Sequence, residues 1–121
     1  MNSDKILKIA LNALNDKKAM ELSAIHVGEL TVIAEYFIIA TANSSSHIKA
    51  LADIVDEKLS GEGIEASHVE GKATGWVLLD YNSVVIHIFS KDAREFYGLD
   101  RMWSDGEQLD LNEILDSEEE K

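Results

Sequence analysis

The predicted fold is organised around residues Gly75 to Tyr97, GWVLLDYNSVVIHIFSKDAREFY. Two apolar runs flank the polar pair Asn82-Ser83, which is typical of a β-hairpin with a tight turn. A short helix then follows from Lys91 to Tyr97. The hairpin predicts an alternation of side chains between two faces, because successive residues of a strand point to opposite sides.

The predicted pairing makes the two faces of the hairpin unequal. One face is apolar at every position and must be buried; it pairs Tyr81 with Val84, Leu79 with Ile86 and Val77 with Ile88. The other face mixes aromatic and titratable groups; it pairs Asp80 with Val85, Leu78 with His87 and Trp76 with Phe89. Such a mixture is typical of a recognition surface. Helices that cover this second face as well are the alternative, since many α/β sheets are buried on both sides.

On both sides of this hairpin and helix, the chain alternates between helical and strand patterns. Residues 4–18 and the segment after Ser44–Ser46 have helical periodicity, and the serines are suited to cap the second helix. Residues 25–33 are predicted as a first strand with a turn at Gly28, 36–41 as a central strand, and 64–70 as a further strand. The plan is an α/β (α+β) fold with a mixed sheet of about five strands flanked by helices. One domain fits the 121 residues.

The last part of the chain differs in composition. Residues 104–121 hold eight Asp or Glu against one Lys, and we predict an acidic C-terminal tail after a domain of residues 1–103. Four apolar residues are spaced for a short amphipathic helix: Leu109, Leu111, Ile114 and Leu115. We expect the tail to serve solubility, with packing of this apolar face onto the domain as the alternative. The final SEEEK is expected to be disordered.

The charge balance restricts the partners. A formal net charge of -12 opposes direct binding to nucleic-acid phosphate, so a partner near nucleic acid should be a basic protein. No apolar run approaches the roughly 18 residues that span a bilayer. The N-terminus lacks a signal-peptide pattern, and the chain has no cysteine, so we expect a cytoplasmic protein without a membrane anchor, disulfides or thiol chemistry.

The sequence lacks the residue patterns that most catalytic and metal sites require. The turn TANSSS before the second helix could present amides to a phosphate, as in nucleotide-binding proteins, although helix capping alone explains its serines. A nucleotidyltransferase needs two or three carboxylates on adjacent strands to hold divalent cations, and Glu29, Glu35 and Asp80 do not supply that arrangement. The four histidines lie on separate segments and lack the spacing of a zinc pair. We therefore expect no catalysis, cofactor or metal.

What remains is a group of large residues around the hairpin. Trp, Tyr and Arg dominate the energetics of protein interfaces, and they gather here. We predict partner binding by Trp76, His87, Phe89, Arg94, Tyr97 and Trp103. Closure of the core edge by Tyr97 and Trp103 is the alternative.

Four motifs in this order carry a resemblance to a known family. They are EYFIIATANSSSHIKALAD, HVEG, GWVLLDYNSVVIHIF and REFYGLDRMW. Over residues 4–103 the chain resembles the ribosomal silencing factors, the Iojap-related proteins. Departures from the family pattern lie mostly in turns: Glu35 replaces Asp, Ala42 replaces Gly, Ser46 replaces Arg, and Asn82-Ser83 replaces Gly-Asp.

The resemblance implies a non-enzymatic factor whose fold is similar to nucleotidyltransferases without their metal site. It implies binding to the fourteenth large-subunit ribosomal protein, which would block joining of the small subunit and repress translation when nutrients are scarce. It also implies a homodimer off the ribosome. The family's contact positions match Trp76, His87, Arg94, Tyr97 and Trp103. A nucleotide-binding or nucleotidyltransferase-like domain, or an assembly factor for the large subunit, are the alternatives.

Overall fold

The hairpin forms with the predicted register. In the computed structural model, which describes residues 3–71 and 75–115, β4 (Trp76–Asp80) pairs antiparallel with β5 (Val84–Ser90). Trp76 lies opposite Phe89, and Leu78 lies opposite His87, as expected. Asn82 takes the left-handed conformation of the tight turn at φ 71°, which asparagine tolerates better than most residues.

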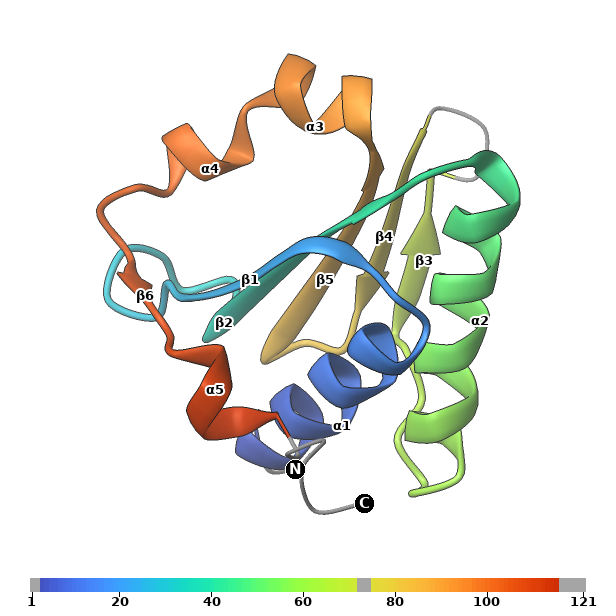
Figure 1. Cartoon of the computed structure of the whole chain (residues 1–121). Helices are drawn as coiled ribbons and strands as arrows, with labels where there is room; N and C mark the ends of the chain where they lie inside the picture. Colours follow the sequence, from blue (N-terminus) through green and yellow to red (C-terminus); the bar gives the residue numbers. More distant parts are fainter. Residues whose placement is uncertain (1–2, 72–74, 116–121) are drawn as a thin grey trace.

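The hairpin belongs to a six-stranded mixed sheet of order β3-β4-β5-β2-β1-β6 (Figure 1). The remaining strands are β1 (Met20–His26), β2 (Tyr36–Ala42), β3 (His68–Glu70) and β6 (Glu107–Gln108). The central pair β2 and β5 is parallel, and the other pairs are antiparallel. The predicted fold class is confirmed, with one short strand more than expected.

One face of the sheet carries the main core. Two helices, α1 (Ser3–Asp16) and α2 (Ser45–Ser60), cover this face (Figure 1). Their apolar stripes pack on the face of the hairpin that was predicted to be buried, and Leu79, Ile86 and Ile88 are at most 2% exposed there. Burial of this kind supplies the dominant stabilising term of the fold.

The opposite face is covered only in part. Above it lie the short helices α3 (Lys91–Tyr97) and α4 (Leu99–Met102) and the segment 27–35 (Figure 1). A second apolar cluster forms beneath them, in which Phe89 is fully buried and His87 is 4% exposed. The β4 side chains on this face, those of Trp76, Leu78 and Asp80, are only half-buried. Helices and the loop thus cover the β5 part of this face, whereas its β4 part stays half-exposed.

The first strand lies earlier than the sequence predicted. Residues 25–33 were expected to form it, but β1 ends at His26 and residues 27–35 form a loop. The amides of Val27 and Gly28 both donate to the carbonyl oxygen of Glu35, so the chain turns back on itself at once. The β-branched Thr31, Val32 and Ile33 misled the prediction, because strand propensity depends on packing partners that this loop lacks. The strand predicted over 64–70 is likewise reduced to His68–Glu70.

The acidic segment contributes to the fold. After residue 103, β6 pairs with β1, and α5 (Leu111–Ile114) follows it. The four apolar residues of this segment are partly buried against the main core: Leu109, Leu111, Ile114 and Leu115. The alternative expectation, that this face packs onto the domain, is thus confirmed. The final SEEEK, residues 117–121, where disorder was predicted, lies outside the described residues.

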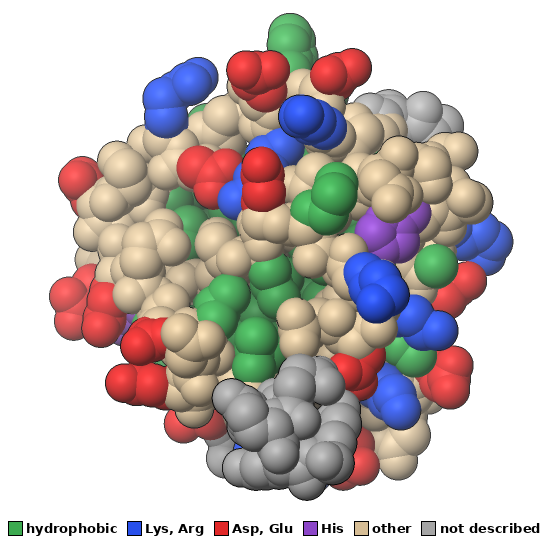
Figure 2. Space-filling view, in the orientation of Figure 1, with side chains coloured by type: hydrophobic (Ala, Val, Ile, Leu, Met, Phe, Trp, Pro, Cys, Tyr) green, Lys and Arg blue, Asp and Glu red, His purple; other side chains and the backbone are tan. Residues whose placement is uncertain are grey.

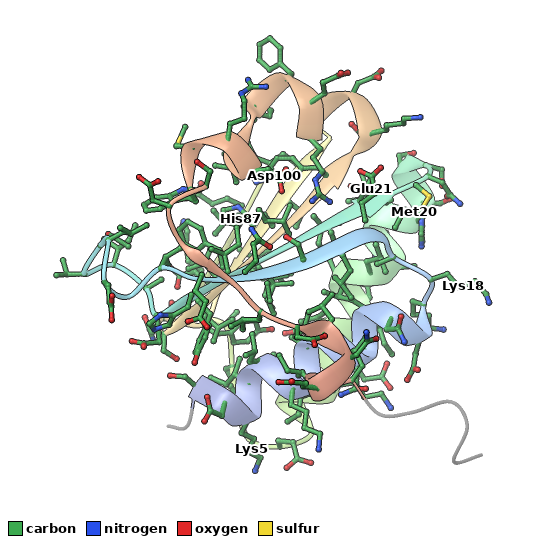
Figure 3. All side chains as sticks on the ribbon, turned by 60° about the vertical axis from the view of Figure 1, so that its left-hand side comes forward. Lys5, Lys18, Met20, Glu21, His87 and Asp100 are labelled. Carbon is green, nitrogen blue, oxygen red and sulfur yellow. The ribbon has the colours of Figure 1, made fainter. Side chains whose placement is uncertain are left out.

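Arg94 fastens α3 to the sheet. Its guanidinium makes a bidentate ion pair with Asp100 at 2.9 and 3.0 Å. It also donates to the hydroxyl of Thr41 on β2 at 3.0 Å and to the carbonyl oxygen of Glu21 on β1. Glu21 and Asp100 lie on the same side of the molecule, near α3 (Figure 3). Only 13% of the Arg94 side chain is exposed, whereas 42% of the Asp100 side chain is, so water screens the ion pair only from the Asp100 side.

We predict that Arg94→Lys lowers the free energy of unfolding by about 1–3 kcal/mol, because an ammonium group cannot reproduce the bidentate pair and also reach both strands. Urea unfolding measures the loss. The exposed Arg101 on α4 offers a matched control, and Arg101→Lys should change the midpoint little. Equal stability of the two variants would contradict the fastening role.

Candidate docking surface

Large apolar side chains reach solvent where α3 and α4 meet the hairpin. Three of them are well exposed: Phe96 at 81%, Met102 at 66% and Tyr97 at 38%. Trp76, Leu78 and Trp103 are half-buried beside them and pack on the second cluster. We call these six residues the aromatic surface. One apolar group projects at the top of Figure 2, over the position of α3 in Figure 1.

The aromatic surface rests on a continuous layer of rings. Trp76 contacts Tyr97 with ring centroids 4.5 Å apart and Phe89 with centroids 5.2 Å apart. Further along, Phe37 meets both His87 and Trp103 edge to face, at 5.0 Å each. Edge-to-face and offset contacts at these separations are favourable beyond the area they bury. The half-buried members of the surface are therefore held in place before any partner arrives.

A hydrogen bond joins this surface to the buried layer. The indole Nε1 of Trp76 lies 3.2 Å from Nδ1 of His87. An indole N–H can only donate, so Nδ1 accepts and the neutral imidazole carries its proton on Nε2. That nitrogen is buried without a hydrogen-bond partner among the described residues. Burial lowers the pKa of His87 from 6.5 to about 4, because the cation would lose its hydration there.

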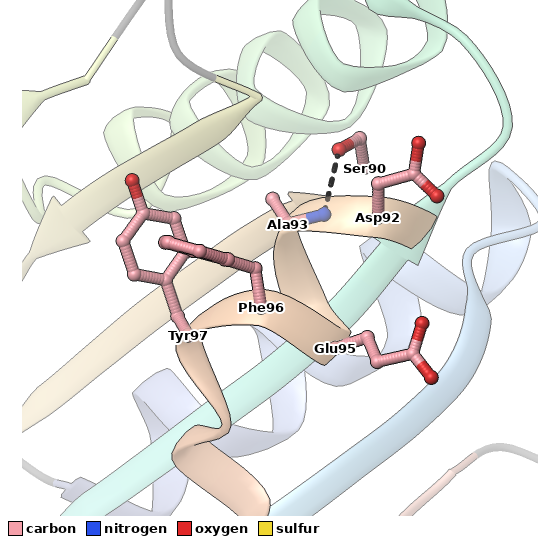
Figure 4. A pocket seen from close by; sticks show the side chains of 6 residues that line it. All are labelled: Ser90, Asp92, Ala93, Glu95, Phe96 and Tyr97. Atoms are coloured by element: carbon pink, nitrogen blue, oxygen red, sulfur yellow. Dashed lines mark hydrogen bonds between the residues drawn. The ribbon is translucent and has the colours of Figure 1, made fainter.

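A hollow lies beside α3 at the edge of the aromatic surface. Its volume is about 660 Å³, and it is lined by Ser90, Asp92, Ala93, Glu95, Phe96 and Tyr97. Figure 4 shows the two rings on one side of the helix and the two carboxylates on the other. The hydroxyl of Ser90 caps the helix by accepting from the amide of Ala93 at 3.1 Å. An apolar wall beside carboxylates suits a partner that carries both apolar and basic side chains.

The loop 27–35 presents a second group of exposed apolar residues. Val32 is fully exposed, Ile33 is 67% exposed and Leu30 is 47% exposed. The base of the same loop, at Val27 and Ala34, is buried in the cluster beneath the aromatic surface. The loop therefore borders the same side of the sheet.

The six residues predicted from sequence lie close together but differ in accessibility. Trp76, Tyr97 and Trp103 reach the surface. His87 and Phe89 lie below it, and the described contacts of Arg94 are made within the chain. Their side chains would act on a partner through the surface they support.

Phe96 and Met102 are the exposed residues that the prediction missed. The sequence held a usable signal, since a seven-residue helix can bury few side chains and α3 buries only Ala93. Phe96 and Tyr97 are neighbours in sequence, and two adjacent aromatic rings cannot both turn into the core from one such helix.

The turn before α2 is explained by capping. The hydroxyl of Ser44 accepts from the amide of His47 at 3.1 Å, and the amide of Asn43 donates to Nδ1 of His47 at 3.0 Å. The other ring nitrogen lies 2.8 Å from the carbonyl oxygen of Lys17. His47 thus ties α2 to the end of α1.

The structure provides two further findings on function. Among residues 3–71 and 75–115, no group of three or more His, Cys, Asp or Glu side chains is placed to hold a metal ion. Within the same residues, no helix is long and apolar enough to cross a membrane. In the view of Figure 2, Asp and Glu side chains lie around much of the outline, in keeping with the net charge of -12.

We predict that His87 makes stability depend on pH. The unfolded chain takes up a proton near pH 6.5, whereas the folded chain resists it down to about pH 4, so stability is fully present above 6.5 and falls as the pH drops. Between pH 7 and 5 the wild type should lose about 2 kcal/mol more than His87→Gln in urea unfolding. Identical pH profiles for the wild type and His87→Gln would refute this prediction.

Comparisons with known proteins agree on one family. The family model described as "Ribosomal silencing factor during starvation" matches residues 1–121, so it also includes the acidic segment. Ribosomal silencing factor RsfS of Bacillus subtilis is 36% identical over 113 residues, which cover 93% of this chain and 96% of that protein. RsfS of Halalkalibacterium halodurans is 34% identical over 116 residues, 95% of this chain and 99% of that protein.

A solved structure shares the fold. The crystal structure of a protein from Chromobacterium violaceum matches with a TM-score of 0.82 at 32% identity, and the match covers 86% of this chain and 88% of that one. Sequence and structure thus lead to the same conclusion. The chain belongs to the ribosomal silencing factor (RsfS) family.

Proposed function

We propose that this protein binds the large ribosomal subunit through its aromatic surface and blocks joining of the small subunit. The observation that carries the proposal is the exposed cluster of Phe96, Tyr97 and Met102 on a chain of the ribosomal silencing family. Exposed aromatic side chains beside charged groups are typical anchors of protein interfaces. The proposed outcome is repression of translation when nutrients are limiting.

The proposed partner on the subunit is its fourteenth protein. An acidic protein that docks beside ribosomal RNA needs a basic protein target, because RNA phosphates repel its charge of -12. The carboxylates of Asp92 and Glu95 flank the rings and would meet basic groups of such a partner. Long-range attraction of this kind mainly raises the association rate.

Blocking by occupancy requires no chemical reaction, only that a bound domain fills the volume that an intersubunit contact needs. We therefore propose a cytoplasmic, non-enzymatic regulator. Off the ribosome we propose a homodimer. In this scheme Arg94, His87 and Phe89 hold α3 and Trp76 in position, and the exposed rings make the contact.

The test replaces the most exposed ring. We expect Phe96→Asp to weaken binding to isolated large subunits at least tenfold in sedimentation assays, equivalent to about 1.4 kcal/mol, while unfolding stays unchanged. Phe96 suits this experiment better than Trp76, whose removal would also break the hydrogen bond to His87.

A matched control is Val69→Asp, which places the same charge at an exposed apolar position on the other side of the sheet. It should bind large subunits like the wild type and shift the subunit equilibrium equally. Full-strength binding by a folded Phe96→Asp protein would remove the aromatic surface from the proposal.

A further inference from the structure

A groove runs between α2 and the β3–β4 edge of the sheet, on the side away from the aromatic surface. Its volume is about 410 Å³. Its apolar wall is formed by Ile48, Ala52, Val69, Val77 and Leu79. The rim on α2 is polar and includes Lys49, Asp53 and Asp56.

The groove lies beside a free sheet edge. β3 is the outermost strand of the sheet, and its only strand partner among the described residues is β4. All three residues of β3 are exposed, and Val69 leaves 41% of its surface in solvent. An open edge offers unpaired backbone groups to an added strand, and an adjoining apolar groove then accepts every second side chain of that strand.

The two sides of this edge differ in chemistry. On the α2 side, Val69 and Leu79 are paired and apolar. On the other side, Glu70 on β3 and Asp80 on the neighbouring β4 carry carboxylates, and Glu70 is paired with His68 of its own strand. Because strand side chains alternate, a strand added to β3 would point one set into the apolar groove and the other set toward these carboxylates.

The charge of the groove's rim favours a basic ligand. Lys49 is already paired with Asp53 at 3.0 Å, so the three charged groups of the rim sum to a single negative charge that Asp56 supplies. The chain's own C-terminal residues are poor candidates, because SEEEK carries three Glu against one Lys. Charge complementarity selects a basic segment from another molecule.

We propose that this groove binds an extended peptide segment of a second protein, in which apolar residues alternate with Lys or Arg, as an added strand along β3. The apolar side chains enter the groove between α2 and β3, and the basic ones face Glu70 and Asp80. The site lies on the opposite side of the sheet from the aromatic surface, so both partners fit at once.

The experiment uses the full chain and a synthetic peptide, acetyl-Val-Lys-Val-Lys-Val-Lys-Val-amide, followed by amide chemical shifts. Saturable shifts confined to β3, β4 and α2 are expected. A Val-Glu peptide of the same length should bind at least tenfold more weakly. Because exposed charges are screened by salt, affinity for the Val-Lys peptide should fall when salt is added. No saturable shift, or equal binding of the two peptides, would overturn the proposal.

Two variants locate the site. Ala52→Trp fills the groove and should abolish binding. Glu70→Lys, a surface change that leaves the core intact, should reduce binding of the Val-Lys peptide and improve that of the Val-Glu peptide. Asp92→Lys on α3 carries the same charge change elsewhere and should leave binding unaltered. Undiminished binding by a folded Ala52→Trp protein and by Glu70→Lys would contradict the assignment.

Two further measurements distinguish peptide binding at this groove from ribosome binding and from self-association of the chain. Phe96→Asp should bind the Val-Lys peptide normally, which keeps the result independent of ribosome binding. Sedimentation of the chain alone should be the same for the wild type and Glu70→Lys. A change in oligomeric state would instead assign the edge to a second copy of the chain and overturn the peptide proposal.

Discussion

The register of the β4–β5 hairpin is the constraint on which the rest of the structure depends. With Trp76 opposite Phe89 and Val77 opposite Ile88, one face is wholly apolar and the other is mixed. A slip by one residue would send the mixed set into the main core, where the half-exposed Asp80 would lose its hydration. The apolar face takes the two long helices, and the mixed face is left to short elements that cover it incompletely. The exposed aromatic surface is a direct result of that incomplete cover.

The parts of the fold that follow from periodicity were predictable from the sequence. The hairpin, α1, α2, α3 and the central strand all have strong local patterns, and both serine caps stand where their helices begin. The first strand was not predictable in this way, because residues 27–35 have strand-like composition and form a loop through two backbone bonds to Glu35. The strand β6 was not predictable either, because its two residues form a strand only by pairing with β1.

The candidate site was predictable as a neighbourhood, but not in its details. The types Trp, Tyr and Arg drew attention to the hairpin and α3, which are adjacent in sequence and stay adjacent in space. Whether a ring points outward depends on the tertiary fold. Phe89 and Phe96 are seven residues apart, yet one is fully buried and the other is 81% exposed. Arg94 has its partners at Glu21 and Thr41, far away in sequence, and no local pattern indicates them.

These internal contacts bear on how the surface can bind. Association costs free energy for every side chain and segment that must be ordered, so an ordered surface binds more tightly than a mobile one of equal area. Arg94 anchors the helix that carries the most exposed ring, and the bond from Trp76 to His87 fixes the indole beside it. A helix of seven residues has little stability of its own, because the free-energy cost of forming its first turn offsets most of the stabilisation by its hydrogen bonds. Tertiary contacts must therefore hold α3 in place, and here the Arg94 hydrogen bonds to Thr41 and Glu21 do so instead of an extensive apolar contact. Phe96 and Tyr97 thereby keep exposed ring surface, while Arg94, His87 and Phe89, which the sequence assigned to the contact itself, support that surface from within the chain.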